Sequence, residues 1–475
     1  NGNKLMSKRG MFFLLLCIGY FVQAQHVNYT VKPGDSRWKM TQDFGISLDS
    51  LAALNPHLSQ TSMELPVGVQ IKIPMLAPPS DGFGSSLPDS LFMEKKAYYT
   101  PASLSDQIPF LDSLQEAPVD LKFLYALPFR LDKMNFQDSL LGQKTIEARR
   151  DMKLSMSFYT GALLAADSLA QMGIKLTAIP VDTQLDGTSF YNNLYKDTIA
   201  TPDAVFGPLS SGVQPVLIRY AQQLQIPAVL PVVSESKLPY ENAFYPVPKE
   251  AILREKLLSY AAKTYAGEKV VLIADEENKE AASQIKELFP RAFEVELIEN
   301  MSIEIDTFAT QLDSVIPNWV FVESENLKLV SSVSSILNAN ITDKVKIKMF
   351  TTNRSKAFDN DVIDNQHLSA LSFCFPSFYK NTTQNAVTQA YEERFGKFPD
   401  ALAIRGFDLT MDMALKMAYK NGWQAAHKQL GPVTYTDHTF YYSPLFKRAG
   451  GSSEGYYNQA SFIMQYEEMD VKLIE

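Results

Sequence analysis

The chain has 475 residues, a length that predicts two or three domains rather than one. Hydrophobic residues make up 46% of it and aromatic residues 11%, which excludes a chain that is disordered by composition. The formal net charge of −9 at pH 7 argues against binding to nucleic acid or to an anionic membrane surface.

The first 24 residues have the features of a secretory signal peptide. Lys8 and Arg9 precede an apolar run from Met11 to Val22, which is too short to span a bilayer. Val22–Ala24 then supplies small residues at the −3 and −1 positions of a cleavage site. We therefore expect residues 1–24 to be removed on export, leaving a chain with a net charge of about −12 and no transmembrane span.

The two cysteines help to define the compartment. Cys17 would make the leader a lipoprotein signal, an alternative that Leu16 disfavours because a small residue is expected before such a cysteine. Cys374 is left alone after cleavage, so the sequence predicts no internal disulfide and no cysteine-based zinc site. A large exported chain without disulfides is typical of the bacterial periplasm. The sequence predicts neither a metal site nor a cofactor.

The segment Tyr29–Pro74 has the pattern of a strand, two short helices and a second strand. Tyr29–Lys32 alternates as a strand does and runs into the turn Pro33–Asp35. Ser36 and Ser47 stand where N-cap residues begin two helices. The closing strand alternates apolar residues at Val69, Ile71 and Ile73.

These residues resemble the LysM family. The pattern V-x-x-G-D-S, a tryptophan in the first helix, a central Leu-Asn-Pro and a closing V-G-x-x-I-x-I-P occur in the family's order. LysM modules bind glycans that contain N-acetylglucosamine, namely peptidoglycan or chitin. The resemblance implies a small βααβ module over residues 27–75. Its shallow groove would lie between the turn after the first strand and the loop after the second helix.

The implied groove differs from the family in two places. Ser36 stands where threonine is commoner and Arg37 where leucine is usual, which changes the polarity of the groove. The residues alone leave a second interpretation open, in which Gly34, Asp35 and Asn55 only shape turns. The glycan-binding residues carried over are Gly34, Asp35, Ser36 and Arg37 on one side and Asn55, Pro56, His57 and Leu58 on the other.

Residues 76–118 show no sustained helical or strand periodicity and are rich in proline, serine and aspartate. This composition predicts a linker that is mostly a disordered spacer. A second interpretation is that Phe110, Leu111 and Leu114 dock as one amphipathic turn.

From Val119 onward strands and helices alternate, which predicts parallel sheets with helices on both faces and an α/β fold class. The first unit has predicted strands at 123–128, 175–181, 203–207 and 228–231 and helices at 155–172 and 213–225. The second has predicted strands at 269–274, 293–298, 319–322 and 346–351 and helices at 250–265, 278–288, 308–316 and 327–339.

This region resembles the type I periplasmic binding proteins, the Venus-flytrap receptors of amino-acid ABC transporters. The match lies in FYTGALLAADSLAQMGIKLTAIPVDT, DAVFGPLSSGVQPV with IPAVLPVVS, EKVVLIADEE and YEERFGKFPDALAIRGFDLTMDMALKMA. It implies a bilobal fold of two doubly wound sheets over residues 119–475. Lobe one would hold 119–246 and 372–431, lobe two 247–371 and 432–475, with crossings near Pro246, Ser372–Phe378 and Pro432.

The same resemblance implies a ligand site in the cleft between the lobes. In that family the ligand's carboxylate lies on hydroxyl and backbone N–H groups at strand ends. The positions carried over are Ser211 and Ser234, with Ser210 as a neighbour, and helix capping is the other interpretation of these serines. A second-lobe carboxylate normally binds the ligand's ammonium, whereas this sequence has Asn353 and Arg354 there. We therefore expect an amino-acid-like or anionic ligand, or a vestigial cleft.

Nothing in the sequence indicates catalysis, and no catalytic residues are predicted. HExxH and a glycine-rich phosphate loop do not occur. Cys374 with His427 or His438 has the residue types of a cysteine peptidase. However, Cys374 lies in the apolar stretch LSFCFPSF and is expected in the core.

These features predict an exported, non-enzymatic binding protein that its LysM module holds on peptidoglycan. Its flytrap domain would sense a small ligand or contact a cell-wall synthesis or other envelope protein. One alternative is the substrate-binding receptor of an amino-acid-type ABC transporter, with which a fixed wall anchor agrees poorly. The other alternative is a LysM-tethered peptidoglycan hydrolase, because such modules often carry wall hydrolases.

Overall fold

The computed structural model describes residues 26–31, 37, 40, 48–56, 58, 65–74, 108–196, 198–236, 238–299, 302–360, 362–444 and 453–475. The chain divides into two compact units, Asn1–Lys95 and Lys96–Glu475. The signal peptide predicted over residues 1–24 lies outside the described residues. Among the described helices, none has both the length and the apolar character needed to cross a membrane.

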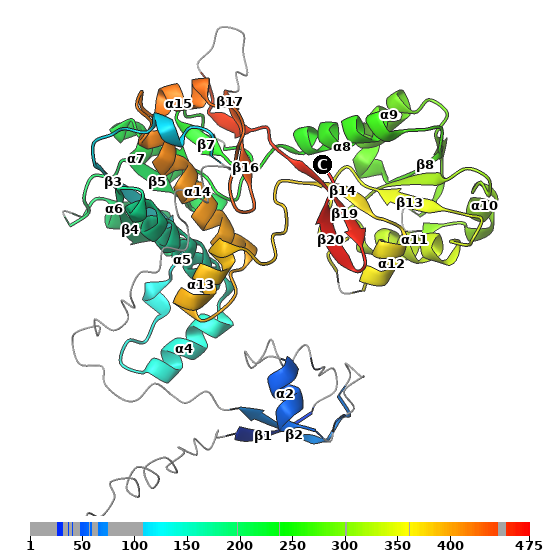
Figure 1. Cartoon of the computed structure of the whole chain (residues 1–475), viewed down its shortest axis with the longest axis horizontal. Helices are drawn as coiled ribbons and strands as arrows, with labels where there is room; N and C mark the ends of the chain where they lie inside the picture. Colours follow the sequence, from blue (N-terminus) through cyan, green and yellow to red (C-terminus); the bar gives the residue numbers. More distant parts are fainter. Residues whose placement is uncertain are drawn as a thin grey trace, which may run out of the picture. The chain divides into compact units, whose positions relative to one another are not determined.

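The small unit contains a two-stranded antiparallel sheet and a helix (Figure 1). β1 (His26–Thr30) pairs along its whole length with β2 (Gln70–Pro74), and α2 (Leu48–Leu54) contacts β2. The sequence predicts a strand, two helices and a strand, and the two strands and the second helix are confirmed. Most of the first predicted helix lies outside the described residues. The core of this unit consists of Val31, Met40, Leu51, Leu58, Leu65 and Ile71.

The large unit contains two seven-stranded sheets within its described residues. In the first sheet the order is β4-β3-β5-β6-β7-β18-β17, and only β17 runs antiparallel to its neighbour. We call the part of the unit that surrounds this sheet the first lobe. Its strands are β3 (Val119–Leu127), β4 (Ile174–Asp182), β5 (Ala204–Phe206), β6 (Ala228–Val229), β7 (Ala243–Tyr245), β17 (Tyr442–Pro444) and β18 (Tyr456–Asn458).

The second sheet has the order β9-β8-β12-β13-β14-β19-β20, with β19 and β20 antiparallel to their neighbours. The part of the unit around it is the second lobe. Its strands are β8 (Lys269–Ala274), β9 (Phe293–Glu294), β12 (Asn318–Glu323), β13 (Ile347–Phe350), β14 (Cys374–Ser377), β19 (Phe462–Glu467) and β20 (Asp470–Leu473). Two further hairpins are β10 (Leu297–Ile298) with β11 (Ser302–Ile303) and β15 (Val433–Thr434) with β16 (Thr439–Phe440).

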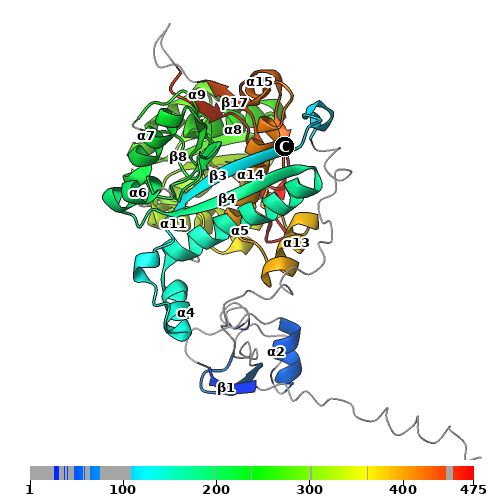
Figure 2. The same ribbon diagram turned by 90° about the vertical axis from the view of Figure 1, so that its left-hand side faces the viewer.

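Helices cover both faces of each sheet because successive residues of a strand point to opposite faces. In β3, Phe123 and Tyr125 pack in the core formed with α5 and α14, and Leu124 and Ala126 in the core formed with α6 and α7. Figure 2 shows these four helices around β3 and β4. In the second sheet, α8 and α9 cover one face and α11 and α12 the other. This arrangement confirms the predicted α/β fold class with two doubly wound sheets.

The helix boundaries agree with the predicted ranges to within a few residues for most elements. The α-helices of the first lobe are α4 (Ser139–Ala148), α5 (Arg150–Gln171), α6 (Gly187–Leu194), α7 (Gln214–Leu224), α13 (Ala386–Phe395), α14 (Ala401–Met417) and α15 (Trp423–Gln429). Those of the second lobe are α8 (Glu250–Thr264), α9 (Lys279–Leu288), α10 (Ile305–Thr310), α11 (Leu327–Ala339) and α12 (Asn365–Ala370).

Three segments connect the two sheets, and one of them was placed wrongly from the sequence. The first follows β7 at Pro246 and the second follows β14 at Phe378. The third lies between β18 and β19, not near Pro432, because β17 and β18 still belong to the first sheet. Residues 372–377 were predicted for lobe one but belong to the second lobe, because β14 pairs with β13 and β19 of the second sheet.

The end of the predicted linker belongs to the large unit. Ile108 and Phe110 are buried in the first lobe's core, and the ring of Phe110 meets that of Tyr419 edge to face. The backbone N–H of Gln115 donates to the carbonyl oxygen of Ala418 at 2.8 Å. A disordered spacer over all of residues 76–118 is therefore wrong for the last eleven, and the docked turn describes them instead.

α5 and α14 cross with their backbones in contact at two glycines. A Cβ atom on Gly161 would lie 1.9 Å from the carbonyl oxygen of Ala403. One on Gly406 would lie 2.1 Å from the carbonyl oxygen of Phe158. Any side chain at either position would force the helices apart, because a packed core cannot absorb such an overlap.

Replacing Gly161 by alanine should therefore lower the free energy of unfolding by about 2–4 kcal/mol. Urea unfolding followed by tryptophan fluorescence measures the change. Gly187→Ala on α6 is the matched control, because its Cβ would meet only a side-chain carbon of Val216, at 3.8 Å. The control should change the free energy by less than about 1 kcal/mol. Equal stability of Gly161→Ala and the wild type would contradict the close helix contact.

Candidate functional site

The connections between the lobes leave from the carboxyl ends of β7, β14 and β18. Loops at the carboxyl ends of the other parallel strands therefore lie at the same edges of their sheets as these connections. In open α/β sheets, ligands bind outside this edge. We call these two regions the carboxyl edges of the first and second sheets, and the candidate site is built from them.

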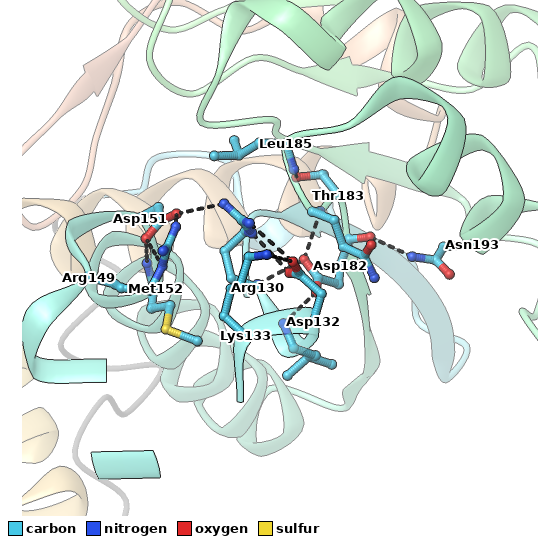
Figure 3. A network of polar contacts seen from close by, with 12 residues as sticks. Arg130, Asp132, Lys133, Arg149, Asp151, Met152, Asp182, Thr183, Leu185 and Asn193 are labelled. Atoms are coloured by element: carbon cyan, nitrogen blue, oxygen red, sulfur yellow. Dashed lines mark hydrogen bonds and ion pairs between the residues drawn. The ribbon is translucent and has the colours of Figure 1, made fainter. Parts of the chain in front are cut away.

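Asp182 organises the ends of β3 and β4 at the carboxyl edge of the first sheet (Figure 3). Its carboxylate accepts hydrogen bonds from the backbone N–H groups of Arg130 at 3.0 Å, Leu131 at 2.7 Å and Gln184 at 2.9 Å. The side-chain amide of Asn193 on α6 donates to the carbonyl oxygen of Asp182 at 2.9 Å. The carboxylate of Asp182 therefore holds the loop after β3 to the loop after β4.

Arg130 connects this edge to residues 131–153, which follow β3, contain α4 and are called the insert below (Figure 3). Its guanidinium donates to Asp132 at 3.0 Å and to Asp151 at 3.4 Å, and Arg149 binds the same Asp151 carboxylate. The Arg130 guanidinium lowers the pKa of the Asp132 carboxyl to about 2. Both arginines are paired with carboxylates, so this network positions the insert.

The three serines predicted for the ligand's carboxylate lie at the ends of neighbouring strands. Ser210 and Ser211 follow β5, and Ser234 follows β6, which pairs in parallel with β5. Ser211 is exposed, and the other two are partly buried. Ser210 precedes the 3-10 turn Ser211–Val213 without capping it through its side chain. Within the described residues none of the three hydroxyls is hydrogen-bonded, so their role as ligand contacts stays a prediction.

A glycine brings this serine loop against β3. Gly207 has a φ of +115°, and a Cβ atom there would lie 2.2 Å from the carbonyl oxygen of Ala126. No other residue fits this backbone and this spacing. The loop that carries Ser210 and Ser211 therefore begins in contact with β3.

Asn353 and Arg354 follow β13 at the carboxyl edge of the second sheet. The Asn353 amide nitrogen lies 3.5 Å from the exposed carboxylate of Glu325. Arg354 pairs with Asp359, and its guanidinium carbon lies 4.3 Å from the ring centroid of Phe375. The inference from Arg354 to an anionic ligand loses its basis, because Asp359 already balances that charge.

Arg354 also lines a polar pocket of about 700 Å³ in the second lobe. Its Nη2 donates to the hydroxyl of Tyr466 on β19 at 3.0 Å. The pocket is lined further by Phe358, Asp359, Asn360, Val362, Ile363, Asp364 and Asn365. These residues lie between the end of β13 and the start of α12, so the pocket belongs to the second lobe alone.

Glu323, at the carboxyl end of β12, is a buried acid on this edge that sequence reasoning missed. The side chain is 1% exposed, and its carboxylate accepts hydrogen bonds from the backbone N–H of Thr352 at 2.8 Å and from its hydroxyl at 2.6 Å. Burial raises the pKa of Glu323 to about 7. The only signal in the sequence was a glutamate closing the apolar strand NWVFVE.

Arg405, on α14, is a second residue at the first edge that sequence reasoning missed. Its Nη1 donates to the carbonyl oxygen of Pro231, just after β6, at 3.3 Å. Its guanidinium carbon lies 4.7 Å from the ring centroid of Phe378, the first residue after β14. A lone cation within ALAIRGFDLTM was the available signal.

In the small unit, the side chain of Asn55 has a structural role. It is 1% exposed, and its amide nitrogen donates to the carbonyl oxygens of Leu51 and Lys72, both at 2.8 Å. Its side-chain oxygen accepts from the N–H of Lys72 at 2.6 Å. This supports the interpretation in which Asn55 shapes a turn. Pro56 beside it is exposed, Arg37 and Leu58 are buried, and Gly34, Asp35, Ser36 and His57 lie outside the described residues.

The residue types of a cysteine peptidase do not come together. Cys374 is buried in the second lobe's core, where burial raises its thiol pKa to about 12. His427 packs among the aromatic rings of the first lobe, and His438 is bonded to Asp408 on α14. Among the described residues, no group of histidine, cysteine and acidic side chains is arranged to hold a metal ion.

Comparison with known families agrees with this architecture. A family model described as periplasmic binding protein matches residues 153–426, and a LysM domain model matches residues 29–74. The chain belongs to the periplasmic binding protein family and carries a LysM domain at its N-terminal side. Both resemblances seen in the sequence are confirmed. Proteins of this family are solute-binding receptors that are periplasmic or extracellular.

Similar solved structures are distant, and no curated protein matches the chain. An ABC-type branched-chain amino acid transporter from Rhodopseudomonas palustris is 12% identical, with a TM-score of 0.46, over 75% of this chain and 95% of that one. An ABC transporter substrate-binding protein from Desulfitobacterium hafniense, in complex with Leu, is 11% identical, with a TM-score of 0.43, over 75% and 99%.

Glu323 predicts a pH dependence of stability. Its pKa is about 7 in the folded chain and near the ordinary 4.5 in the unfolded chain. The folded state therefore binds the proton more tightly, and stability falls as pH rises through 7. Glu323→Gln keeps partners for Thr352 and should be more stable than the wild type at about pH 8, by about 1–3 kcal/mol, but not at about pH 4.

Urea unfolding at the two pH values measures this effect. Glu325→Gln, which changes the exposed acid two residues on, is the control and should alter the free energy of unfolding by less than about 0.5 kcal/mol. A Glu323→Gln variant with the wild type's pH dependence would show that Glu323 ionises normally.

Proposed function

We propose that the protein is an exported, non-enzymatic binding protein that its LysM module holds on peptidoglycan, while its large unit binds a small ligand. The observation that carries this proposal is the presence in one chain of a LysM domain and a solute-binding domain of the periplasmic binding protein family. The large unit then either senses its ligand or contacts a cell-wall synthesis or envelope protein.

The wall-binding part of the proposal is supported by the fold of the small unit. Asn55 joins the end of α2 to β2 through three hydrogen bonds, and this leaves Pro56 exposed on the loop predicted as one side of the groove. Glycan binding through this loop and the turn Gly34–Arg37 is the function that we assign to the module.

The ligand-binding part is supported by the carboxyl edge of the first sheet. Ser210, Ser211 and Ser234 offer hydroxyls that no other described side chain uses. On the second edge, the exposed carboxylate of Glu325 beside Asn353 is a partner for an ammonium group, the role that the family gives to an acid. The site thus suits an amino-acid-like ligand, and solved relatives are described in complex with leucine and with isoleucine.

The chain reaches the periplasm through a signal peptide cleaved after Ala24, with lipidation of Cys17 as the alternative. A receptor that delivers its ligand to an ABC permease is a second candidate function, favoured by the family match. A fixed wall anchor fits such delivery poorly. Wall hydrolysis loses the centre that these residue types suggested, because Cys374 and His427 lie in the cores of different lobes.

Binding to purified peptidoglycan sacculi tests the anchor. The chain from residue 25 should sediment with sacculi, and deletion of residues 25–76 should abolish this. Asn55→Ala should do the same, because it removes three buried hydrogen bonds worth about 2–4 kcal/mol from a small module. Gln70→Ala changes an exposed side chain on β2 and should bind as the wild type does. Sedimentation that survives the deletion would move wall recognition to the large unit.

A further inference from the structure

The guanidinium of Arg405 lies where the first sheet meets a connection between the lobes. Its Nη1 bonds the carbonyl oxygen of Pro231, two residues beyond β6, at 3.3 Å. One face of the guanidinium lies over Phe378, with 4.7 Å from its central carbon to the ring centroid. Phe378 opens the segment that leaves β14 for the first lobe (Figure 1). Arg405 is therefore at the carboxyl edge and beside a hinge segment.

The charge of Arg405 has no direct counter-ion among the described residues. The side chain forms no ion pair there, and its Nε is buried without a hydrogen-bond partner. The neighbouring Asp437 acts on it only at longer range, and its carboxylate accepts a bond from the N–H of Thr382 at 2.8 Å. Desolvation lowers the pKa of Arg405 to about 10.

Among the described residues of this unit, Lys416 and Arg254 are the most buried cations, at 2% and 6% exposed, and both are paired. Lys416 binds Asp412 at 2.6 Å, and Arg254 binds Glu250 at 2.7 Å and Glu280 at 2.9 Å. Removing a cation from water without a counter-charge costs several kcal/mol, and an anion that binds beside it offsets that cost. A guanidinium also offers several N–H donors in one plane, which matches the oxygens of a carboxylate or phosphate.

Unused hydroxyls lie on the same edge. Ser234 is three residues beyond Pro231, whose carbonyl holds Arg405, and Ser210 and Ser211 follow the adjacent strand β5. An acid group at Arg405 would therefore bind at the sheet edge from which both serine-bearing loops leave. Arg354, by contrast, is neutralised by Asp359.

We propose that Arg405 is an oxyanion-binding residue of the ligand site, which selects small molecules with a carboxylate or phosphate group in addition to what the serines bind. The assignment rests on the proposed function of the large unit as a small-ligand receptor. It moves the charge preference of the site from Arg354 in the second lobe to Arg405 in the first. Because Phe378 stacks on the same guanidinium, the bound oxyanion also contacts the hinge side of the site.

Thermal unfolding of the chain from residue 25 tests this assignment. Acetate, succinate and inorganic phosphate are titrated at constant ionic strength against chloride, with acetamide as the uncharged probe and the common amino acids as a separate panel. At least one oxyanion should raise the Tm of the wild type while acetamide does not. The apparent Kd should rise at least tenfold in Arg405→Met and less in Arg405→Lys, and it should be unchanged in Arg354→Met.

The other possible outcomes distinguish a failure of the Arg405 assignment from a failure of the proposed function. Equal oxyanion binding by Arg405→Met and the wild type would overturn the role of Arg405 and leave a small-ligand receptor in place. Stabilisation by amino acids but by no oxyanion would overturn the ligand class alone. If no compound stabilises the wild type, both proposals fall. Where Arg405→Met does not fold, Arg405→Lys decides, because it keeps the charge and loses the planar set of donors.

Discussion

The first lobe depends on a helix contact that tolerates no side chain. Gly161 on α5 and Gly406 on α14 let the two backbones touch, which fixes the position of α14 over the sheet. From this position Asp408 accepts hydrogen bonds from the backbone N–H groups of residues 436–438 and from Nδ1 of His438. Asp408 thereby holds the turn between β15 and β16. Arg405 lies one turn earlier on the same helix, so the contact that anchors α14 also fixes its place at the carboxyl edge.

α14 also shows how this fold treats the charges that it buries. Lys416 pairs with Asp412 one turn earlier, and Asp412 accepts a further bond from the hydroxyl of Tyr435 at 3.1 Å. Asp408 is satisfied by backbone groups and one imidazole. Arg405 is the one charged residue of α14 without such an arrangement within the described structure. Strongly perturbed and unpaired groups concentrate at functional sites, which separates Arg405 from the charges that only stabilise the helix.

Much of the fold could be predicted because buried parallel strands are continuous apolar runs, as in KVVLIA and NWVFVE. The predictions that were wrong concern features that depend on contacts between segments far apart in the sequence. Nothing in the local sequence indicates that Tyr456 pairs with Phe244 of the first sheet. The helix predicted over 308–316 is displaced to Ile305–Thr310, because Asp313 accepts bonds from the N–H groups of Val315 and Ile316 and forms a turn.

The candidate site shows the same limit. The serine positions followed from strand ends, which local sequence marks well. Whether an arginine is free or neutralised depends on partners that local sequence does not identify, as Asp359 is for Arg354. If the acid group of a ligand binds Arg405, it binds the first lobe at a residue that contacts Phe378 in a connection between the lobes. The LysM domain has a core of its own, so the proposed wall anchor and the proposed ligand site lie in separate compact units of the chain.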